Sequence, residues 1–316
     1  MGKNGVCSVN VLGQTIGENF AIYHGDSCEV IKGIPSESID YSVFSPPFSS
    51  LYTYSNSDRD IGNVKNDDEF FAHFGFLISE IMRVMKPGRL VSMHCMLLPT
   101  SKERDGYIGL KDFRGDLIRA FQAAGFIFHS EVAIWKDPVT AMQRTKALGL
   151  LHKTIRKDSS MSRQGINDYL VTMRKPGTNP DPVAHDHDSF PVERWQRYAS
   201  PVWVTVNGYD DEGMGICKPD IDPGDTLQYR SARENDDERH ICPLQLDVIR
   251  RAVRLWTNPG DVVLSPFGGI GAEGVVALEE GRKAVLCELK RSYYEQAARN
   301  LVACESKSDE QMSLFA

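Results

Sequence analysis

The segment from residue 261 to 287 constrains the fold more than any other part of the chain. Residues 261–267, DVVLSPF, form an apolar run rich in β-branched side chains, which predicts a buried strand. A glycine-rich turn follows, then a predicted helix over 272–280 and a second apolar run over 283–287. A strand, a turn, a helix and a strand in this order form the repeating unit of an α/β sheet. The segment therefore predicts an α/β fold.

The turn itself carries a nucleotide-binding pattern. Gly269, Gly271 and Gly274 give G-x-G-x-x-G between a strand and a helix, which is the context that this motif needs. Glu288 stands at the tip of the next strand, where a carboxylate can hold a ribose diol. A glycine-rich turn that binds nothing is the alternative, but an acidic residue at this place favours a nucleotide-containing ligand.

A second motif follows an earlier apolar run. Residues 39–44 predict a buried strand, and Ser45, Pro46, Pro47 and Phe48 come directly after it. Two consecutive prolines end the hydrogen-bonding ladder and hold the backbone extended. The Ser45 hydroxyl and the Pro46 carbonyl can then accept hydrogen bonds from an exocyclic amine, while the Phe48 ring stacks on a planar heterocycle. An ordinary exit from a strand is the alternative, since Pro-Pro dipeptides are common at turns.

The two motifs together resemble those of the S-adenosylmethionine-dependent DNA amino-methyltransferases. Within that family the chain is similar to the permuted group, in which the SPPF-type motif precedes the target-recognition region and the F-x-G-x-G cofactor motif comes last. The resemblance covers roughly residues 20–138 and 238–304. It implies a Rossmann-like, doubly wound and mostly parallel sheet with S-adenosyl-L-methionine as the cofactor. It also implies methyl transfer to an exocyclic amino group of a base flipped out of DNA.

The resemblance implies roles for individual residues. Catalysis falls to Ser45, Pro46, Pro47 and Phe48, and cofactor binding to Asp26, Phe267, Gly268, Gly269, Gly271 and Glu288. One position departs from the family pattern, because Ser265 stands where an acidic residue usually precedes Pro266. A serine before Pro-Pro is commoner in the cytosine-N4 enzymes of the family than in the adenine-N6 enzymes. N4 of cytosine is therefore the expected target, and N6 of adenine is the alternative.

The other predicted elements extend the α/β pattern on both sides of an interruption. Helices are predicted over 67–85, 114–124, 244–256 and 292–304, and strands over 90–95 and 126–135. Residues 139–237 break the alternation of strands and helices. We therefore expect a catalytic domain over 1–138 and 238–304, an inserted target-recognition region over 139–237 and a flexible tail over 305–316. In the loop after the SPPF motif, Tyr52 or Tyr54 can add stacking on the base, with packing within the loop as the alternative. Asp58, Arg59 and Asp60 can meet the amino-acid end of the cofactor or the DNA.

The charge distribution favours double-stranded DNA as the partner although the net charge is −7. Residues 136–175 contain nine Lys or Arg and only three Asp, a local excess that can neutralise backbone phosphates. A solvated surface helix is the alternative for this segment. Residues 181–238 reverse the balance with fourteen Asp or Glu against five Lys or Arg, and predict loops on the far side of the inserted region. Residues 185–188, HDHD, lie there and are expected to be solvated rather than to bind a metal.

Cysteine spacing and hydropathy limit the class of protein. The seven cysteines show no C-x-x-C spacing, so reduced buried thiols are expected rather than a zinc site or disulfides. The sequence has no signal peptide and no apolar run long enough to span a membrane. We expect a cytoplasmic enzyme of a bacterium or its phage, with no membrane partner. A restriction partner would be a separate chain, because the sequence has no carboxylate-lysine cluster typical of nucleases.

The last residues carry a separate prediction. Gln311, Leu314 and Phe315 lie in QMSLF, which resembles the peptide by which bacterial replication proteins bind the sliding clamp. A frayed end whose apolar residues pack on the parent domain is the alternative. Two other functions compete with DNA methylation: methylation of an RNA base or a protein amide, and a non-catalytic DNA-binding module with a degenerate cofactor site. The intact glycine and SPPF motifs argue against the module.

Overall fold

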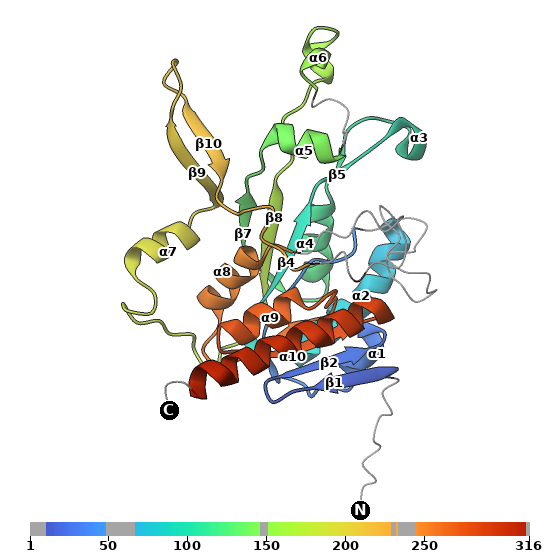
Figure 1. The fold of residues 1–316 in the computed structure, drawn as a ribbon. Coiled ribbons are helices and arrows are strands. Elements are labelled where there is room, and N and C mark those ends of the chain that lie inside the picture. Colours follow the sequence, from blue (N-terminus) through green and yellow to red (C-terminus); the bar gives the residue numbers. More distant parts are fainter. Residues whose placement is uncertain (1–10, 49–66, 146–150, 229–231, 233–243, 314–316) are drawn as a thin grey trace, which may run out of the picture.

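One large sheet organises the chain. The computed structural model describes residues 11–48, 67–145, 151–228, 232 and 244–313 (Figure 1). Ten strands of this part form a sheet in the order β1-β2-β12-β11-β3-β4-β8-β7-β9-β10. In that order their bounds are Gly13–Ile16, Phe20–His24, Lys283–Glu288, Val262–Ser265, Ile39–Phe44, Met85–Met96, Asp168–Arg174, Ile127–Ile134, Val202–Tyr209 and Gly215–Pro219. A separate ribbon pairs β5 (Leu98–Pro99) with β6 (Leu110–Lys111).

The middle of the sheet is parallel. β2, β12, β11, β3 and β4 all run in the same direction, and β8 lies antiparallel between β4 and β7. The predicted α/β fold with a mostly parallel sheet is confirmed. Because parallel strands end at the same edge of a sheet, the turns after β3, β11 and β12 meet at one edge. We call this the carboxyl edge, and the side from which these strands begin the amino edge.

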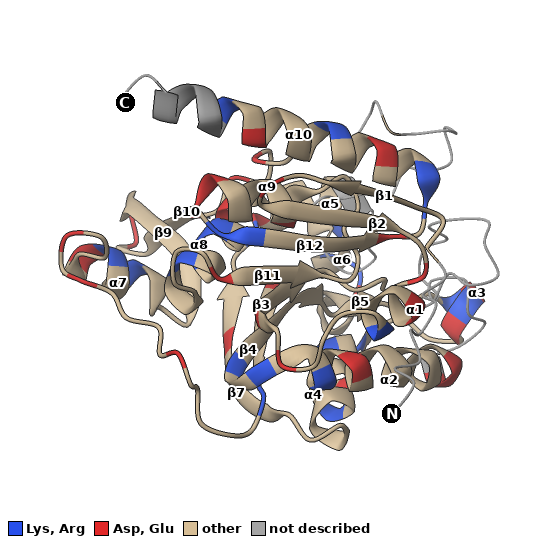
Figure 2. Cartoon of the chain, turned by 90° about the horizontal axis from the view of Figure 1, so that it is seen from below, with Lys and Arg blue, Asp and Glu red and all other residues tan. Residues whose placement is uncertain are grey.

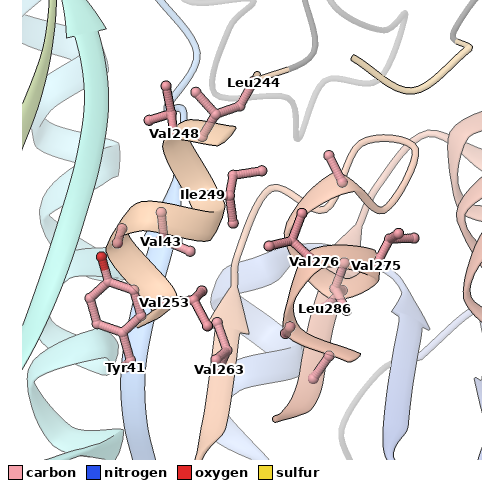
Figure 3. Packing of buried hydrophobic residues seen from close by; sticks show 14 of the residues in the cluster. Tyr41, Val43, Leu244, Val248, Ile249, Val253, Val263, Val275, Val276 and Leu286 are labelled. Carbon is pink, nitrogen blue, oxygen red and sulfur yellow. The ribbon is translucent and has the colours of Figure 1, made fainter. Parts of the chain in front are cut away.

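Helices cover both faces of the sheet, as Figures 1 and 2 show. One face carries α8 (Leu246–Trp256), α9 (Ala272–Glu279) and α10 (Arg291–Ser313), and the other carries α1 (Ser27–Lys32), α2 (Asp67–Val84) and α4 (Phe113–Ala123). Each face has its own apolar core. In Figure 3, Val253 of α8 lies near Tyr41 of β3 and Val263 of β11. The doubly wound architecture follows from helices that bury one apolar face each.

The expected insertion over 139–237 is not one continuous departure from the sheet. Asp168–Arg174 forms β8, which lies inside the sheet between β4 and β7. Its residues from Leu170 to Met173 are fully buried, as expected for a strand that is covered on both faces. The segments before and after β8 are therefore the parts of this region that stand outside the sheet.

Several of those segments extend beyond the carboxyl edge of β4 (Figure 1). They include α5 (Pro138–Thr145), α6 (His152–Ile155), the short 3-10 helix Ser159–Met161 and the β9–β10 hairpin, while α7 (Val192–Tyr198) lies to one side. α3 (Lys102–Asp105), next to the β5–β6 ribbon, lies on the opposite flank. No helix in the described ranges is long and apolar enough to cross a membrane.

The C-terminal residues differ from the predicted flexible tail. α10 continues to Ser313, so residues 305–313 are helical. Glu305 fixes this extension, because its carboxylate accepts a hydrogen bond from the Asn19 backbone N–H at 2.7 Å. Of the proposed clamp-binding residues, Leu314 and Phe315 lie outside the described part of the chain.

Candidate active site

Three neighbouring strands bring the two predicted motifs together at the carboxyl edge. β11 lies between β12 and β3, so the glycine turn follows a strand adjacent to the one that ends at Ser45. The Ser42 hydroxyl donates to the Leu264 carbonyl at 2.9 Å and ties β3 to β11. On the other side, the Gly268 N–H donates to the Cys287 carbonyl at 2.8 Å. The turn and the SPPF motif are therefore held side by side by rigid strands.

The glycine turn is open on one side and closed on the other. Gly269 has a φ of 51°, and a Cβ at this position would meet no atom within 4 Å. Gly271 has a φ of 91° and begins α9, and a Cβ there would lie 3.2 Å from Ala297. A Cβ on Gly274 would lie 2.7 Å from Leu301. Gly271 and Gly274 thus let α9 pack against α10, whereas Gly269 leaves a space that a ligand can occupy.

Glu288 is fixed beneath this turn. Its Oε2 accepts from the Gly269 N–H at 2.7 Å, and its Oε1 accepts from the Lys290 N–H at 2.8 Å. The two backbone donors therefore set the direction of the carboxylate beside the space at Gly269, as binding of a sugar diol requires.

Asp26 is joined to the same site through the backbone. The Gly25 N–H donates to the Glu288 carbonyl at 3.0 Å, which places the end of β2 beside the end of β12. Asp26 caps α1 by accepting from the Cys28 N–H at 2.8 Å. The buried Ser27 hydroxyl donates to the Pro266 carbonyl and so links α1 to the glycine turn.

Phe267 has a packing role in addition to its predicted place beside the cofactor. Its ring centroid lies 5.7 Å from that of Phe44 and 6.3 Å from that of Phe74. Gly268 is packed as tightly, since a Cβ there would lie 3.1 Å from the Leu286 side chain. These two residues set the shape of the turn, and their predicted contact with a cofactor remains a prediction.

The SPPF motif divides into a buried and an accessible half. Pro46 and Pro47 are buried, whereas Ser45 and Phe48 are partly exposed. The Phe48 ring packs edge-on against Phe113 at the start of α4, with 6.1 Å between ring centroids. The proline rings therefore anchor the backbone, and Ser45 and Phe48 have the side chains that a substrate can reach.

Sequence reasoning missed a polar group behind Ser45. The Ser45 hydroxyl lies 3.3 Å from the His94 carbonyl and 3.5 Å from His94 Nδ1. His94 Nε2 lies 3.0 Å from an oxygen of Asp168, which also pairs with Lys136. Burial alone would raise the pKa of Asp168, but His94 and Lys136 together hold it below its ordinary value. A polar residue at the end of the apolar strand β4 was the only sequence signal for His94.

Two further buried polar groups lie at this edge, Ser265 and Glu273. Ser265, which replaces the acidic residue of the family pattern, has a buried hydroxyl with no hydrogen-bond partner among the described atoms. Glu273 is buried in the first turn of α9, and burial followed by the charge of Glu288 raises its pKa to about 8. Buried polar groups without structural partners are typical of ligand sites.

The basic segment 136–175 is only partly available to DNA. Lys136 pairs with buried Asp168, and Lys175 donates to the Met85 carbonyl at 2.8 Å, at the amino edge. The exposed cations Lys153, Arg156 and Lys157 lie on or just after α6. The loop residues Tyr52, Tyr54, Asp58, Arg59 and Asp60 lie outside the described residues.

The structure offers little support for a metal centre. His185 Nε2 lies 3.0 Å from the Leu255 carbonyl, and its ring stacks on Phe190. Within the described ranges, the carboxylates that approach one another closely enough to share an ion are Asp40, Asp181 and Asp261. Arg89 pairs with all three and supplies the compensating charge. Cys28, Cys95, Cys217 and Cys287 are free thiols, and the Cys304 thiol donates to the Val275 carbonyl at 3.7 Å.

Comparisons with known proteins agree with this geometry. The family model described as DNA methylase, for N6 and N4 enzymes, matches residues 39–299. The type II methyltransferase M.BglII of Bacillus subtilis is 25% identical over 281 residues, which cover 87% of this chain and 67% of the relative. The DNA adenine methyltransferase YhdJ of Escherichia coli (strain K12) is 23% identical over 301 residues, which cover 92% of this chain and 86% of the relative.

Solved structures share the fold. The cytosine-N4-specific PvuII DNA methyltransferase is 16% identical, with a TM-score of 0.61 over 94% of this chain and 96% of that chain. TTHA0409 of Thermus thermophilus, in complex with S-adenosyl-L-methionine, is 20% identical, with a TM-score of 0.62 over 91% of this chain and 96% of that chain. At these identities the likeness concerns the arrangement of strands and helices.

Proposed function

Because the chain belongs to the N6/N4 DNA methylase family and is an S-adenosylmethionine-dependent DNA methyltransferase, we propose that its methyl acceptor is N4 of a flipped cytosine. The observation that carries this proposal is the position of Ser45. Its partly exposed side chain directly follows β3, beside the strand whose glycine turn is open at Gly269. An amine held by Ser45 would therefore lie next to a cofactor held at the turn.

Two observations support cytosine over adenine. A serine precedes the two prolines, as is commoner in cytosine-N4 enzymes of the family, and the PvuII enzyme with the same fold is cytosine-N4-specific. YhdJ, a relative that aligns with most of the chain, is an adenine methyltransferase. N6 of adenine is therefore the second candidate, and it would use the same residues.

We assign the cofactor to the space above Gly269. Glu288, which is oriented by two backbone donors, would hold the ribose diol, and Asp26, at the adjoining end of β2, would lie near the adenine. The residues fit such a group, because the turn is open where a side chain would fill it. When bound, S-adenosylmethionine supplies an electrophilic methyl group on a sulfonium sulfur.

The chain must compensate for the weak nucleophilicity of an aromatic amine. The amine lone pair is delocalised into the ring, so positioning and charge stabilisation matter more than a strong base. Hydrogen bonds from the amine to the Ser45 hydroxyl and the Pro46 carbonyl favour a pyramidal nitrogen whose lone pair points at the methyl group. Phe48 holds the base after it leaves the duplex stack.

DNA recognition is assigned to the segments of 139–237 that stand outside the sheet, with 1–138 and 238–304 as the catalytic domain. α5, α6 and the β9–β10 hairpin lie beyond the carboxyl edge, where a duplex must approach to deliver a flipped base (Figure 1). The exposed cations Lys153, Arg156 and Lys157 can neutralise its phosphates. The relatives named type II methyltransferases make a restriction-modification role the natural biological setting.

The test is nucleoside analysis of DNA incubated with the protein and isotopically labelled S-adenosylmethionine. We expect labelled N4-methylcytosine from the wild type and its loss from Ser45→Ala. Labelled N6-methyladenine would overturn the choice of base while leaving the active site in place. No label on any DNA, with the cofactor still bound, would favour an RNA base or a protein amide as the acceptor.

A docking role of the C-terminus on the sliding clamp is a separate proposal. It rests on the QMSLF sequence, in which Gln311, Leu314 and Phe315 are the proposed contacts. We expect immobilised clamp to retain the wild type and to release the double variant Leu314→Ala/Phe315→Ala. Equal retention of the two proteins would end this proposal.

A further inference from the structure

Ser45 is the outer member of a row of four polar side chains. Behind it, His94 lies two residues before the end of β4, Asp168 begins β8, and Lys136 lies two residues after β7. Asp168 and His94 are buried, at 2% and 8% exposure, and Lys136 is partly exposed. The row therefore has two partly exposed ends, Ser45 at the proposed substrate position and Lys136, and two buried members between them. None of the three inner members contacts the target amine or the cofactor in the proposed mechanism.

The buried carboxylate determines how the imidazole is protonated. Asp168 pairs with Lys136 and with His94 Nε2, and these two partners keep its pKa below the ordinary value. An ionised carboxylate can only accept hydrogen bonds, so the Nε2 of His94 carries the proton that it donates. In a neutral imidazole the Nδ1 atom is then bare and can only accept.

The state of His94 in turn determines the direction of the Ser45 hydroxyl. Both groups of His94 that Ser45 approaches, the carbonyl at 3.3 Å and Nδ1 at 3.5 Å, are acceptors in this tautomer. The Ser45 O–H therefore points inward to His94, and the oxygen lone pairs point away from it. A hydroxyl held in this way accepts hydrogen bonds on its outer side and does not donate there.

We propose that His94 and Asp168 are positioning residues that hold the Ser45 hydroxyl as a hydrogen-bond acceptor for the target amine, with Lys136 paired to Asp168. The proposal rests on the assignment of Ser45 to the amine, and it holds equally for cytosine and adenine. An amine N–H needs an acceptor, and a hydroxyl free to rotate would spend part of its time presenting its own hydrogen to the nitrogen.

The charged groups around this row are few among the described residues. Asp168 comes from β8 and Lys136 from the chain after β7, and Arg114 of α4 lies over the ring of Tyr169, 5.0 Å from its centroid. Arg114 is itself paired with Glu131 at 3.0 Å. Lys136 is thus the cation in direct contact with Asp168.

The experiment is a double-mutant cycle between Ser45 and Asp168, measured as single-turnover methyl transfer to DNA. Asp168→Asn keeps the shape of the side chain but exchanges the ionised acceptor shared by His94 and Lys136 for a neutral amide, which weakens the preference for the tautomer whose Nδ1 is bare. We expect the rate to fall roughly tenfold to a hundredfold. In the Ser45→Ala background, the same substitution should change the residual rate by less than about threefold.

Two further measurements separate positioning from general damage. The dissociation constant for S-adenosylmethionine, measured by calorimetry, should stay within about twofold of the wild type, since the row does not contact Glu288 or Gly269. Where Asp168→Asn does not fold, as judged by circular dichroism and melting, His94→Gln serves in the same cycle. Glutamine retains a donor toward Asp168 but has no acceptor at the Nδ1 position.

The results that would overturn the positioning role differ from those that would overturn the proposed methyl acceptor. Equal loss of rate with and without the Ser45 hydroxyl would overturn the proposal, as would a fall in cofactor affinity that accounts for the whole loss. If the wild-type protein methylates adenine, the proposed base is wrong. The double-mutant cycle then tests the same positioning role with adenine methylation as the measured rate. A wild-type protein that methylates no DNA would overturn both the proposed function and the positioning role of His94 and Asp168.

Discussion

The two edges of the sheet differ in how their buried polar and charged side chains are paired. At the amino edge, Arg89 is 2% exposed and donates to Asp261 at 3.0 Å and to Asp40 at 3.1 Å. Asp40 also pairs with Lys86 and accepts from the Val262 N–H. At the carboxyl edge, the buried Ser265 hydroxyl has no partner among the described atoms, and burial raises the pKa of Glu273.

This difference separates a structural ion network from a binding site. The charge of Arg89 is balanced by the neighbouring carboxylates and needs no further charged group, although its Nε has no hydrogen-bond partner among the described atoms. The unpartnered Ser265 hydroxyl near an open glycine turn costs stability, and a ligand that pairs with it would recover that cost. We therefore expect the amino edge to stabilise the fold and the carboxyl edge to bind a ligand. Substitutions at the two edges should separate stability from binding.

Arg89→Leu should have the largest effect of the substitutions, and this effect should be a loss of unfolding free energy. It leaves two buried carboxylates facing each other, which typically costs about 3–5 kcal/mol of unfolding free energy. Urea unfolding measures the loss, and cofactor affinity of the folded fraction should be unchanged. Arg250→Leu is the control, because its ion pairs with Glu279 and Glu280 are partly exposed, and such pairs contribute about 0–1 kcal/mol. Similar losses for the two variants would remove the contrast between the edges.

Gly269→Val should have the second-largest effect, and this effect should be a loss of affinity for S-adenosylmethionine. The added side chain enters the space assigned to the cofactor, so we expect the affinity for S-adenosylmethionine to fall roughly a hundredfold or more. Gly260→Val is matched in backbone strain, since Gly260 has a φ of 83° and open space around its Cβ position. Gly260 lies in the turn before β11, at the amino edge, and its substitution should leave affinity intact. Undiminished binding by Gly269→Val in calorimetry would reject the turn as the cofactor site.

Phe48→Ala should reduce methyl transfer more than cofactor binding. Loss of one base-stacking contact costs about 1–3 kcal/mol, so we expect the single-turnover rate to fall roughly tenfold to a hundredfold. Phe76→Ala is the control, because that ring is 69% exposed on α2. A collapse of cofactor affinity in Phe48→Ala would place this ring at the cofactor instead of the base.

Glu273→Gln should have the smallest effect, visible as a change in pH dependence. The pKa of Glu273 is raised from 4.5 to about 8 in the folded protein, so the unfolded chain loses this proton at lower pH than the folded one. The contribution of Glu273 to stability is therefore present below about pH 4.5 and is lost as pH rises towards about 8. Without cofactor, the Gln variant should melt at a higher temperature than the wild type at pH 8, by a few degrees.

The control for this substitution is Glu279→Gln on the same helix, where the carboxylate is exposed enough to be solvated in both states. At pH 5, Glu273→Gln and the wild type should melt at similar temperatures. A pH-independent difference between them would show that the substitution acts through packing and not through ionisation.

Much of the carboxyl edge could be predicted, because the residues that form it lie close together in the sequence. The strand before Gly268, the glycine turn and the strand ending at Glu288 are contiguous in sequence, and local pattern sets their structure. Ser45 and the prolines follow β3 directly, so strand order alone brings them to the turn. Sequence reasoning therefore located the glycine turn and Ser45, the two features on which the proposed function depends.

The parts that escaped prediction depend on long-range pairing. β8 was placed within the expected insertion because the segments around it break the pattern, and only its pairing with β4 and β7 reveals it as a sheet strand. The same pairing places Asp168 opposite Met96 and Ile134, and so beside His94. His94 lies near the end of one segment and Asp168 begins another that is distant in sequence. Nothing in the sequence signals that these two side chains meet. Glu305, which holds α10 to the first turn, escaped for the same reason.

The most direct test of the central claim is an amide NMR titration of the protein with S-adenosylmethionine. The account predicts that the largest shifts occur at Gly25, Gly269, Gly271 and Lys290, the amides around Glu288, and that Gly88 and Gly260 at the amino edge stay still. The largest shifts at the amino edge, with Gly269 unmoved, would contradict the assignment of the active site to the carboxyl edge.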